Sequence, residues 1–164
     1  LKLLGIIFLL ISFYSASEIR EYRGFEYFLF IITVSIFTDI GGYVFGKTFN
    51  GPKLTKISPN KTYAGVFGGF LLSLIAGLIY LNYFGESEIV DTDYILIFLL
   101  ILFISSISQI GDLIISFFKR KAKLKDTGKI LPGHGGLLDR IDGLVFVMPT
   151  IYLLGKIWKR ELQF

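Results

Sequence analysis

The 164-residue sequence is too apolar for a soluble domain, because 53% of its residues are hydrophobic, 18% are charged and its mean hydropathy is +0.66. Soluble domains are about 25% charged. The chain contains no cysteine, which excludes disulfides, thiolate metal sites and cysteine nucleophiles. The net charge of +4 does not indicate nucleic-acid binding. In a membrane protein, the distribution of basic residues among the loops indicates which side of the membrane each loop occupies. We therefore expect no nucleic acid among its partners.

Five apolar segments predict an all-α, polytopic helical membrane protein. They span residues 3–16, 25–45, 64–85, 94–118 and 141–158. Residues 64–85 and 94–111 carry no charge over 22 and 18 positions. These lengths are close to the about 20 residues that a helix needs to cross a bilayer core of roughly 30 Å. We therefore expect about five transmembrane segments. The third would be capped by Ser58 or, more in keeping with a structural role, Thr62, and the fifth would be interrupted by Pro149.

The polar parts of the chain are too short for a separate soluble domain, since the longest, residues 119–140, has about 22 residues. Residues 1–164 are therefore expected to form a single membrane-embedded domain. The first apolar segment has 14 residues, about 21 Å as a helix, which is short for a span. The sequence also lacks an initial Met. We expect a short or truncated first helix and a chain that is the C-terminal part of a longer protein.

The connecting loops differ in charge. Because successive spans alternate sides, one set of loops carries 12 of the 17 basic residues and the other carries five. The positive-inside rule makes the basic side cytoplasmic. We therefore expect a multi-pass protein of the inner, cytoplasmic membrane whose polar site faces the cytoplasm. Five aspartates lie on this same basic side of the membrane, namely Asp39, Asp112, Asp126, Asp139 and Asp142.

Aspartates in or beside the apolar segments are candidate functional residues. A carboxylate in a membrane helix costs several kcal/mol unless it is paired or solvated, and this applies to Asp39 and Asp112. Asp139 and Asp142 are three residues apart, on one face of a helix, where two carboxylates can hold a divalent cation. Two alternatives stay open: Asp112 at a helix end that reaches the interface, solvated or paired to Lys119 or Arg120, and the other pair at a solvated helix N-terminus.

The two basic loops are suited to phosphate groups. Residues 119–140 combine lysines, which supply charge, with a Pro-Gly-His-Gly-Gly turn, which exposes backbone N–H donors. A merely positive loop explains the lysines but not that turn, which is followed after two leucines by Asp-Arg-Ile-Asp. Near Asp39, three glycines permit close helix packing or a broken helix lining a cavity, and Ser58 and Lys61 follow. Carboxylates, a divalent cation and phosphate-binding residues are typical of phosphoryl or nucleotidyl transfer.

At these residues the sequence resembles the CTP:phosphatidate cytidylyltransferases, or CDP-diacylglycerol synthases. It reads Ser-Phe-Phe-Lys-Arg from Ser116, Lys-Asp-Thr-Gly from Lys125, and Leu-Pro-Gly-His-Gly-Gly-Leu-Leu-Asp-Arg-Ile-Asp from Leu131. Every fixed position of the family signature is filled over 27 residues. Upstream elements of the family extend the resemblance to residues 38–149. One departure is Tyr63-Ala64, where the family commonly has Trp-Glu, so the acidic residue is absent.

The resemblance implies a nucleotidyltransferase that converts CTP and phosphatidate to CDP-diacylglycerol and pyrophosphate in phospholipid biosynthesis. It implies Mg²⁺ as the cofactor, allows K⁺ to share the centre, and suggests a homodimer among membrane lipids. The implied metal ligands are Asp112, Asp139 and Asp142, and the implied catalytic set adds Lys119 and Arg120. The implied substrate-binding residues are Ser58, Lys61, Lys125, His134, Gly135, Gly136, Arg140 and Asp39.

Two functions other than cytidylyl transfer to phosphatidate are also open to this sequence. One is a related CTP-dependent membrane enzyme that acts on another lipid, such as an ether-lipid phosphate or a polyprenol. The other is a non-enzymatic cation pathway or scaffold, in which Asp39 and Asp112 would line a pore. The complete signature argues against the first, and the second leaves the spacing of the His-Gly-Gly turn and the Asp-Arg-Ile-Asp sequence unexplained.

Overall fold

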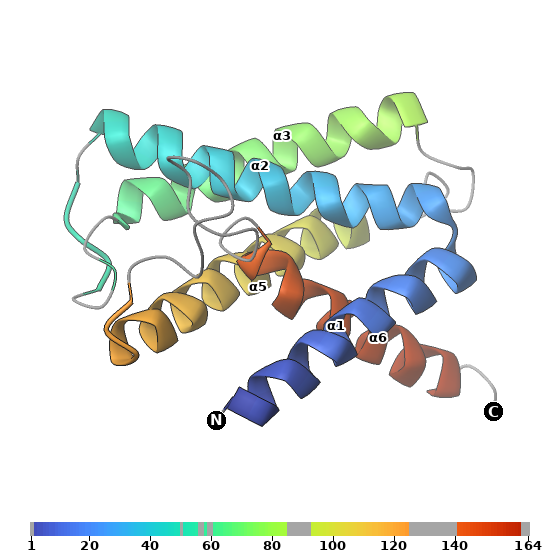
Figure 1. The fold of residues 1–164 in the computed structure, drawn as a ribbon. Coiled ribbons are helices and arrows are strands. Elements are labelled where there is room, and N and C mark those ends of the chain that lie inside the picture. Colours follow the sequence, from blue (N-terminus) through green and yellow to red (C-terminus); the bar gives the residue numbers. More distant parts are fainter. Residues whose placement is uncertain are drawn as a thin grey trace.

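The computed structural model describes residues 2–49, 51–55, 58, 61–84, 93–124 and 141–161. This part of the chain contains helices and no named strand, with one isolated bridge between Lys53 and Thr62. The helices are α1 (Lys2–Arg23), α2 (Phe25–Phe49), α3 (Tyr63–Phe84), α5 (Tyr94–Lys121) and α6 (Asp142–Glu161) (Figure 1). The all-α prediction is confirmed.

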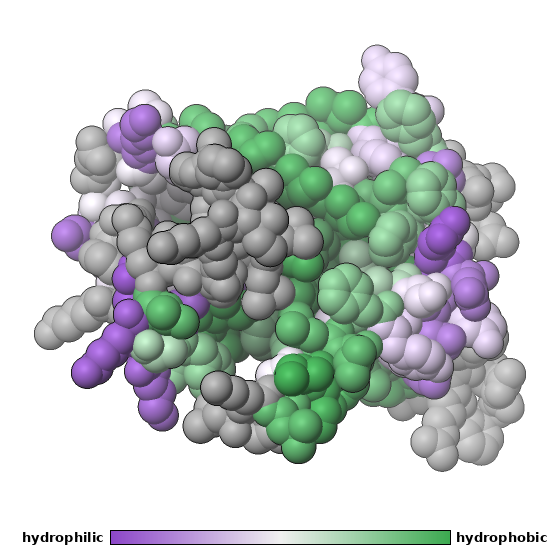
Figure 2. Space-filling model, viewed as in Figure 1, coloured by the Kyte–Doolittle hydropathy of each residue, from purple (hydrophilic) through white to green (hydrophobic). Residues whose placement is uncertain are grey.

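Three helices, α2, α3 and α5, are long and apolar enough to cross a membrane. Large hydrophobic side chains stay exposed on them, including Phe67, Ile75 and Leu99, as expected for surfaces that face lipid. Figure 2 shows a hydrophobic band across the middle of the molecule, with hydrophilic residues gathered at its two ends. The fold is that of a helical membrane protein with polar ends.

Helix α1 is longer than the predicted apolar segment and continues to Arg23. Its second half is held by packing, since Ile19 is buried in the central core. The helix ends at Gly24, whose φ of 88° lies in the left-handed region that glycine adopts without strain. The chain reverses there into α2 (Figure 1).

Helices α2 and α3 run antiparallel and pack through glycines (Figure 1). A Cβ atom placed on Gly41 would lie 2.2 Å from the carbonyl oxygen of Gly68, and one on Gly65 would lie 2.7 Å from the carbonyl oxygen of Gly42. Small residues let membrane helices approach until their backbones touch. Of the two readings of the glycines near Asp39, close packing is therefore the one observed, and α2 continues unbroken to Phe49.

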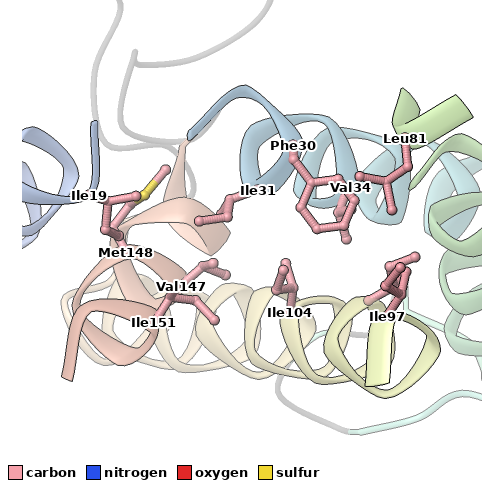
Figure 3. Packing of buried hydrophobic residues seen from close by; sticks show 11 residues of the cluster. Ile19, Phe30, Ile31, Val34, Leu81, Ile97, Ile104, Val147, Met148 and Ile151 are labelled. Atoms are coloured by element: carbon pink, nitrogen blue, oxygen red, sulfur yellow. The ribbon is translucent and has the colours of Figure 1, made fainter. Parts of the chain in front are cut away.

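The apolar core joins all five helices around α5 (Figure 3). The interior also contains buried hydroxyl groups, among them those of Ser35, Ser73 and Ser105. The core consists of Ile19, Phe30, Ile31, Val34, Leu81, Ile97, Ile101, Ile104, Val147, Met148 and Ile151.

Helix α6 runs through Pro149 without a break, so the predicted interruption is wrong. Proline removes the backbone donor that would bond the carbonyl four residues earlier, here that of Val145. The hydroxyl of Ser12 on α1 donates to that carbonyl at 2.7 Å. Neighbouring hydroxyls of this kind are what let proline persist in membrane helices.

Candidate active site

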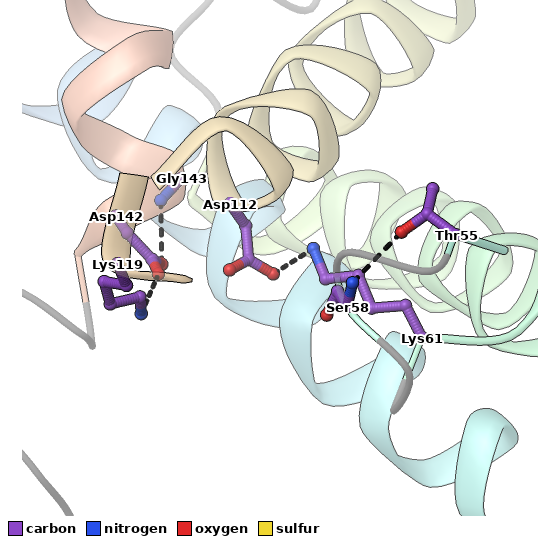
Figure 4. A network of polar contacts seen from close by, with 7 residues as sticks. All are labelled: Thr55, Ser58, Lys61, Asp112, Lys119, Asp142 and Gly143. Atoms are coloured by element: carbon purple, nitrogen blue, oxygen red, sulfur yellow. Dashed lines mark hydrogen bonds and ion pairs between the residues drawn. The ribbon is translucent and has the colours of Figure 1, made fainter. Parts of the chain in front are cut away.

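Two ion pairs lie at the polar end where α5 meets the start of α6 and the segment preceding α3 (Figure 4). Lys61 is paired with Asp112 of α5, and both side chains are about three-quarters buried. The ammonium nitrogen of Lys119 lies 3.7 Å from Oδ2 of Asp142. Asp142 is 4% exposed. The fold therefore assembles two carboxylates and two ammonium groups from three distant parts of the sequence.

Lys61 is held in place by a hydrogen-bonded turn of its own segment. Its carbonyl accepts a bond from the Leu54 amide at 2.8 Å, and its amide donates to the Ser58 carbonyl at 3.1 Å. The Ser58 amide in turn donates to the hydroxyl of Thr55 at 3.1 Å (Figure 4). The predicted cap is confirmed, because the Gly65 amide donates to the Thr62 hydroxyl at 3.1 Å. These bonds fix the direction in which Lys61 leaves the backbone.

A close crossing of α5 and α6 brings the two aspartates together. A Cβ atom on Gly143 would lie 2.3 Å from the hydroxyl oxygen of Ser108 and 3.2 Å from its carbonyl oxygen. A Cβ atom on Gly111 would lie 2.8 Å from the ring of Phe146. Because Asp112 follows one of these glycines and Asp142 precedes the other, the crossing places both carboxylates at the same end of the bundle.

A third aspartate adds to the negative charge at this end. Asp39 on α2 interacts electrostatically with Asp112 and Lys61, and Asp142 interacts with both other aspartates. The three carboxylates repel one another, and the positive charges of Lys61 and Lys119 offset part of their negative charge. Negative charge at this end attracts cations, and carboxylate oxygens are the ligands that hard divalent cations prefer. Lysines beside it are suited to phosphate oxygens.

The structure describes seven of the predicted site residues. Ser58 is half-buried, and Asp39 and Arg120 are exposed. The ion pair between Asp112 and Lys61 supplies the basic partner, though from a residue far earlier in the chain than expected. The remaining predicted site residues lie outside the described residues: Lys125, His134, Gly135, Gly136, Asp139 and Arg140.

The described residues alone do not form a complete set of metal ligands. Among them, no three acidic or histidine side chains form a group that could hold a metal ion. Asp112 and Asp142 are two of the three predicted ligands, and the third, Asp139, is outside the described residues. The three-residue metal set stays a prediction.

One pair of polar side chains that the structure brings together was not identified from the sequence. The hydroxyls of Thr38 on α2 and Ser105 on α5 are hydrogen-bonded at 2.9 Å in the bundle interior. The available signal was the spacing of Ser105, Ser108 and Asp112, which places them on one face of a helix. Spacing on α5 alone does not reveal the partner residue on α2.

Together, fold and site define a polytopic helical membrane protein that gathers carboxylates, lysines and glycine-rich crossings at one polar end. Its sequence matches the cytidylyltransferase family over residues 1–158. The chain belongs to this family.

Relatives from several bacteria are similar over nearly the whole chain. It is 43% identical to a phosphatidate cytidylyltransferase of Staphylococcus saprophyticus over 155 residues, which cover 93% of the chain and 57% of that relative. It is 40% identical to the phosphatidate cytidylyltransferase of Bacillus subtilis over 154 residues, 92% of the chain and 56% of that relative. The protein of the same name from Brucella suis is 40% identical over 157 residues, 94% of the chain and 56% of that relative. The chain thus spans a little over half the length of these relatives.

Proposed function

We propose that the protein catalyses cytidylyl transfer from CTP to phosphatidate, giving CDP-diacylglycerol and pyrophosphate for phospholipid biosynthesis. A phosphate oxygen of phosphatidate would attack the α-phosphorus of CTP. The bond from that phosphorus to the bridging oxygen would break, and pyrophosphate would leave. The observation that carries the proposal is the pair of carboxylate–lysine contacts, Asp112 with Lys61 and Asp142 with Lys119, at one polar end of a membrane bundle. The family and the names of the relatives support it.

Positioning and charge neutralisation can account for most of the catalysis. The phosphatidate phosphate is already anionic near neutral pH, so the reaction needs no strong general base. What it needs is two anionic substrates held in line against their mutual repulsion. Lys61, Lys119 and Arg120 would supply the positive charge for phosphate oxygens, with Ser58 contributing a hydroxyl. Lys125, His134, Gly135, Gly136 and Arg140 complete the proposed substrate-binding set, together with Asp39.

We infer that this site binds a divalent cation, Mg²⁺. Asp112 and Asp142 offer hard oxygen ligands, and each already attracts an ammonium group, which marks two places where positive charge is stabilised. We infer that they hold the ion together with Asp139, with K⁺ as an additional ion of the same centre. Bound there, the cation would neutralise charge on the triphosphate and on the leaving pyrophosphate. Lys61 and Lys119 would then exchange their carboxylate partners for phosphate oxygens.

The site is proposed to face the cytoplasm from the inner membrane. CTP is a soluble, highly charged nucleotide and reaches the site only from an aqueous compartment that contains it. The basic residues gathered at this end favour the cytoplasmic side, and the phosphatidate headgroup would approach from the adjoining leaflet. Homodimerisation stays a prediction.

We expect phosphatidate, rather than another lipid phosphate, to accept the cytidylyl group. Membranes containing the protein would be incubated with radiolabelled CTP and Mg²⁺, and with phosphatidate, an archaeal ether-lipid phosphate or a polyprenol. The expected result is a labelled lipid with phosphatidate only, and none in matched membranes that lack the protein. Label incorporated into the ether lipid or the polyprenol alone would overturn the substrate assignment while leaving CTP-dependent transfer in place.

A further inference from the structure

A buried hydrogen-bond cluster links α2 to α5 inside the bundle. The hydroxyl oxygens of Thr38 and Ser105 are 2.9 Å apart, and these residues are 1% and 0% exposed. The side-chain amide of Gln109 donates to the Ser105 hydroxyl at 3.4 Å. The Thr38 hydroxyl also bonds the Val34 carbonyl of its own helix at 2.8 Å. We call Thr38, Ser105 and Gln109 the hydroxyl clamp.

Helix α3 encloses the hydroxyl clamp from a third side. A Cβ atom on Gly69 would lie 3.0 Å from the Thr38 carbonyl oxygen and 3.1 Å from the side-chain nitrogen of Gln109. Around this point the core side chains Val34, Ile101 and Ile104 are fully buried. A hydrogen bond between polar groups in such surroundings is favourable, so the clamp favours one rotation of α2 against α5.

The residues of the clamp are neighbours of the site carboxylates along both helices. Thr38 directly precedes Asp39, and consecutive residues of a helix are separated by a fixed rotation and a rise of about 1.5 Å. Ser105 lies two turns before Asp112 on the same face of α5. Fixing Thr38 against Ser105 therefore also fixes the direction of Asp39 relative to Asp112, with which it interacts electrostatically.

We propose that the hydroxyl clamp is a positioning element of the polar site. It sets the rotation of α2 against α5 and so holds Asp39 close enough to Asp112 to strengthen the field that attracts a cation. Thr38 and Ser105 are positioning residues that act through the two aspartates. The inference rests on the proposed function only in that the carboxylates bind a divalent cation. A clamp that merely joined two helices would change stability without changing cation affinity.

Replacement of Thr38 by valine tests the inference, because Thr38→Val keeps the side-chain shape and removes the hydroxyl. Binding of Mn²⁺, used as a spectroscopic probe of the divalent site, would be measured by electron paramagnetic resonance on the purified protein in lipid nanodiscs. We expect Thr38→Val to weaken Mn²⁺ binding about fivefold, since the carboxylate field falls with distance. Thr38→Ser restores the hydroxyl and should bind within about twofold of wild type, on the same argument.

The matched control is Thr48→Val on the same helix. The hydroxyl of Thr48 bonds the Val44 carbonyl at 2.8 Å but is exposed, so its loss should leave Mn²⁺ binding unchanged. If Thr38→Val does not fold, Ser105→Ala removes the other hydroxyl of the clamp. Its control is Ser106→Ala, which removes a hydroxyl bonded only within α5, to the Leu102 carbonyl.

The inference is overturned if Thr38→Val binds Mn²⁺ like wild type, even when that variant is less stable to heat. It is also overturned if Thr38→Ser fails to restore binding. Transfer from CTP would be assayed on the same samples. Absence of transfer by the wild-type protein would refute the proposed function, while the Mn²⁺ comparison would still decide whether the clamp positions the carboxylates.

Discussion

Asp112→Asn is expected to lower cytidylyl transfer by about 10³-fold or more, as when a preorganised charge is removed from a reacting centre. The amide has the size of the carboxylate, so packing beside Gly111 is preserved. It carries no negative charge, however, and can neither attract a divalent cation strongly nor pair with Lys61. Turnover would be measured with saturating CTP, phosphatidate and Mg²⁺, on protein whose membrane insertion matches wild type.

Glu26→Gln is the matched control for Asp112→Asn. Glu26 is also a helix carboxylate, but it accepts a hydrogen bond from the Tyr80 hydroxyl at 2.8 Å near the beginning of α2. Its amide variant should retain near-normal transfer, because no part of the proposed chemistry involves it. Near-normal turnover by Asp112→Asn would remove this aspartate from the metal-ligand set. An equal loss in both variants would mean that carboxylate replacement harms the fold rather than the site.

Gly41→Ala is expected to destabilise the bundle by about 1–3 kcal/mol, the usual cost of overpacking. Alanine normally stabilises a helix relative to glycine. A loss of stability would therefore come from the contact with α3. The added Cβ atom would lie 2.2 Å from the Gly68 carbonyl oxygen and 2.7 Å from its carbon. These are backbone atoms and cannot move aside as a side chain can, so α2 and α3 must separate. Thermal unfolding in one detergent measures the change.

The neighbouring residue provides the control for Gly41→Ala. A Cβ atom on Gly42 would meet only the Gly65 carbonyl oxygen, at an ordinary 3.7 Å. Gly42→Ala should therefore be as stable as wild type or slightly more so, because the helix preference of alanine then acts alone. Equal stabilities of the two variants would contradict the close α2–α3 packing.

The fold was largely predictable because each apolar segment became one helix. The two predictions that differ from the structure, the end of the first helix and the break at Pro149, concern places where contacts with neighbouring helices stabilise the helix. The first predicted apolar segment ends at residue 16, yet α1 extends to Arg23 because Ile19 packs into the core. Pro149 looked like a helix break, yet the carbonyl that it leaves unpaired accepts a bond from Ser12, on a different helix.

The candidate site was predictable in its residue types but not in its pairings. The cost of a carboxylate in an apolar segment identified Asp39 and Asp112 without any structure. The partner of Asp112 is Lys61, and only the crossing of helices and the turn preceding α3 can bring these two residues together. Thr38 and Ser105 were missed for the same reason, since their contact depends on how α2 is rotated against α5.

Nucleotidyl transfer at this polar end is tested most directly by following two labels in one assay. Membranes containing the protein would receive phosphatidate, Mg²⁺ and CTP labelled at either its α-phosphate or its γ-phosphate. We expect the α-label to appear in the lipid and the γ-label to leave as pyrophosphate. A γ-label in the lipid would contradict cytidylyl transfer, because the protein would then transfer a phosphoryl group instead.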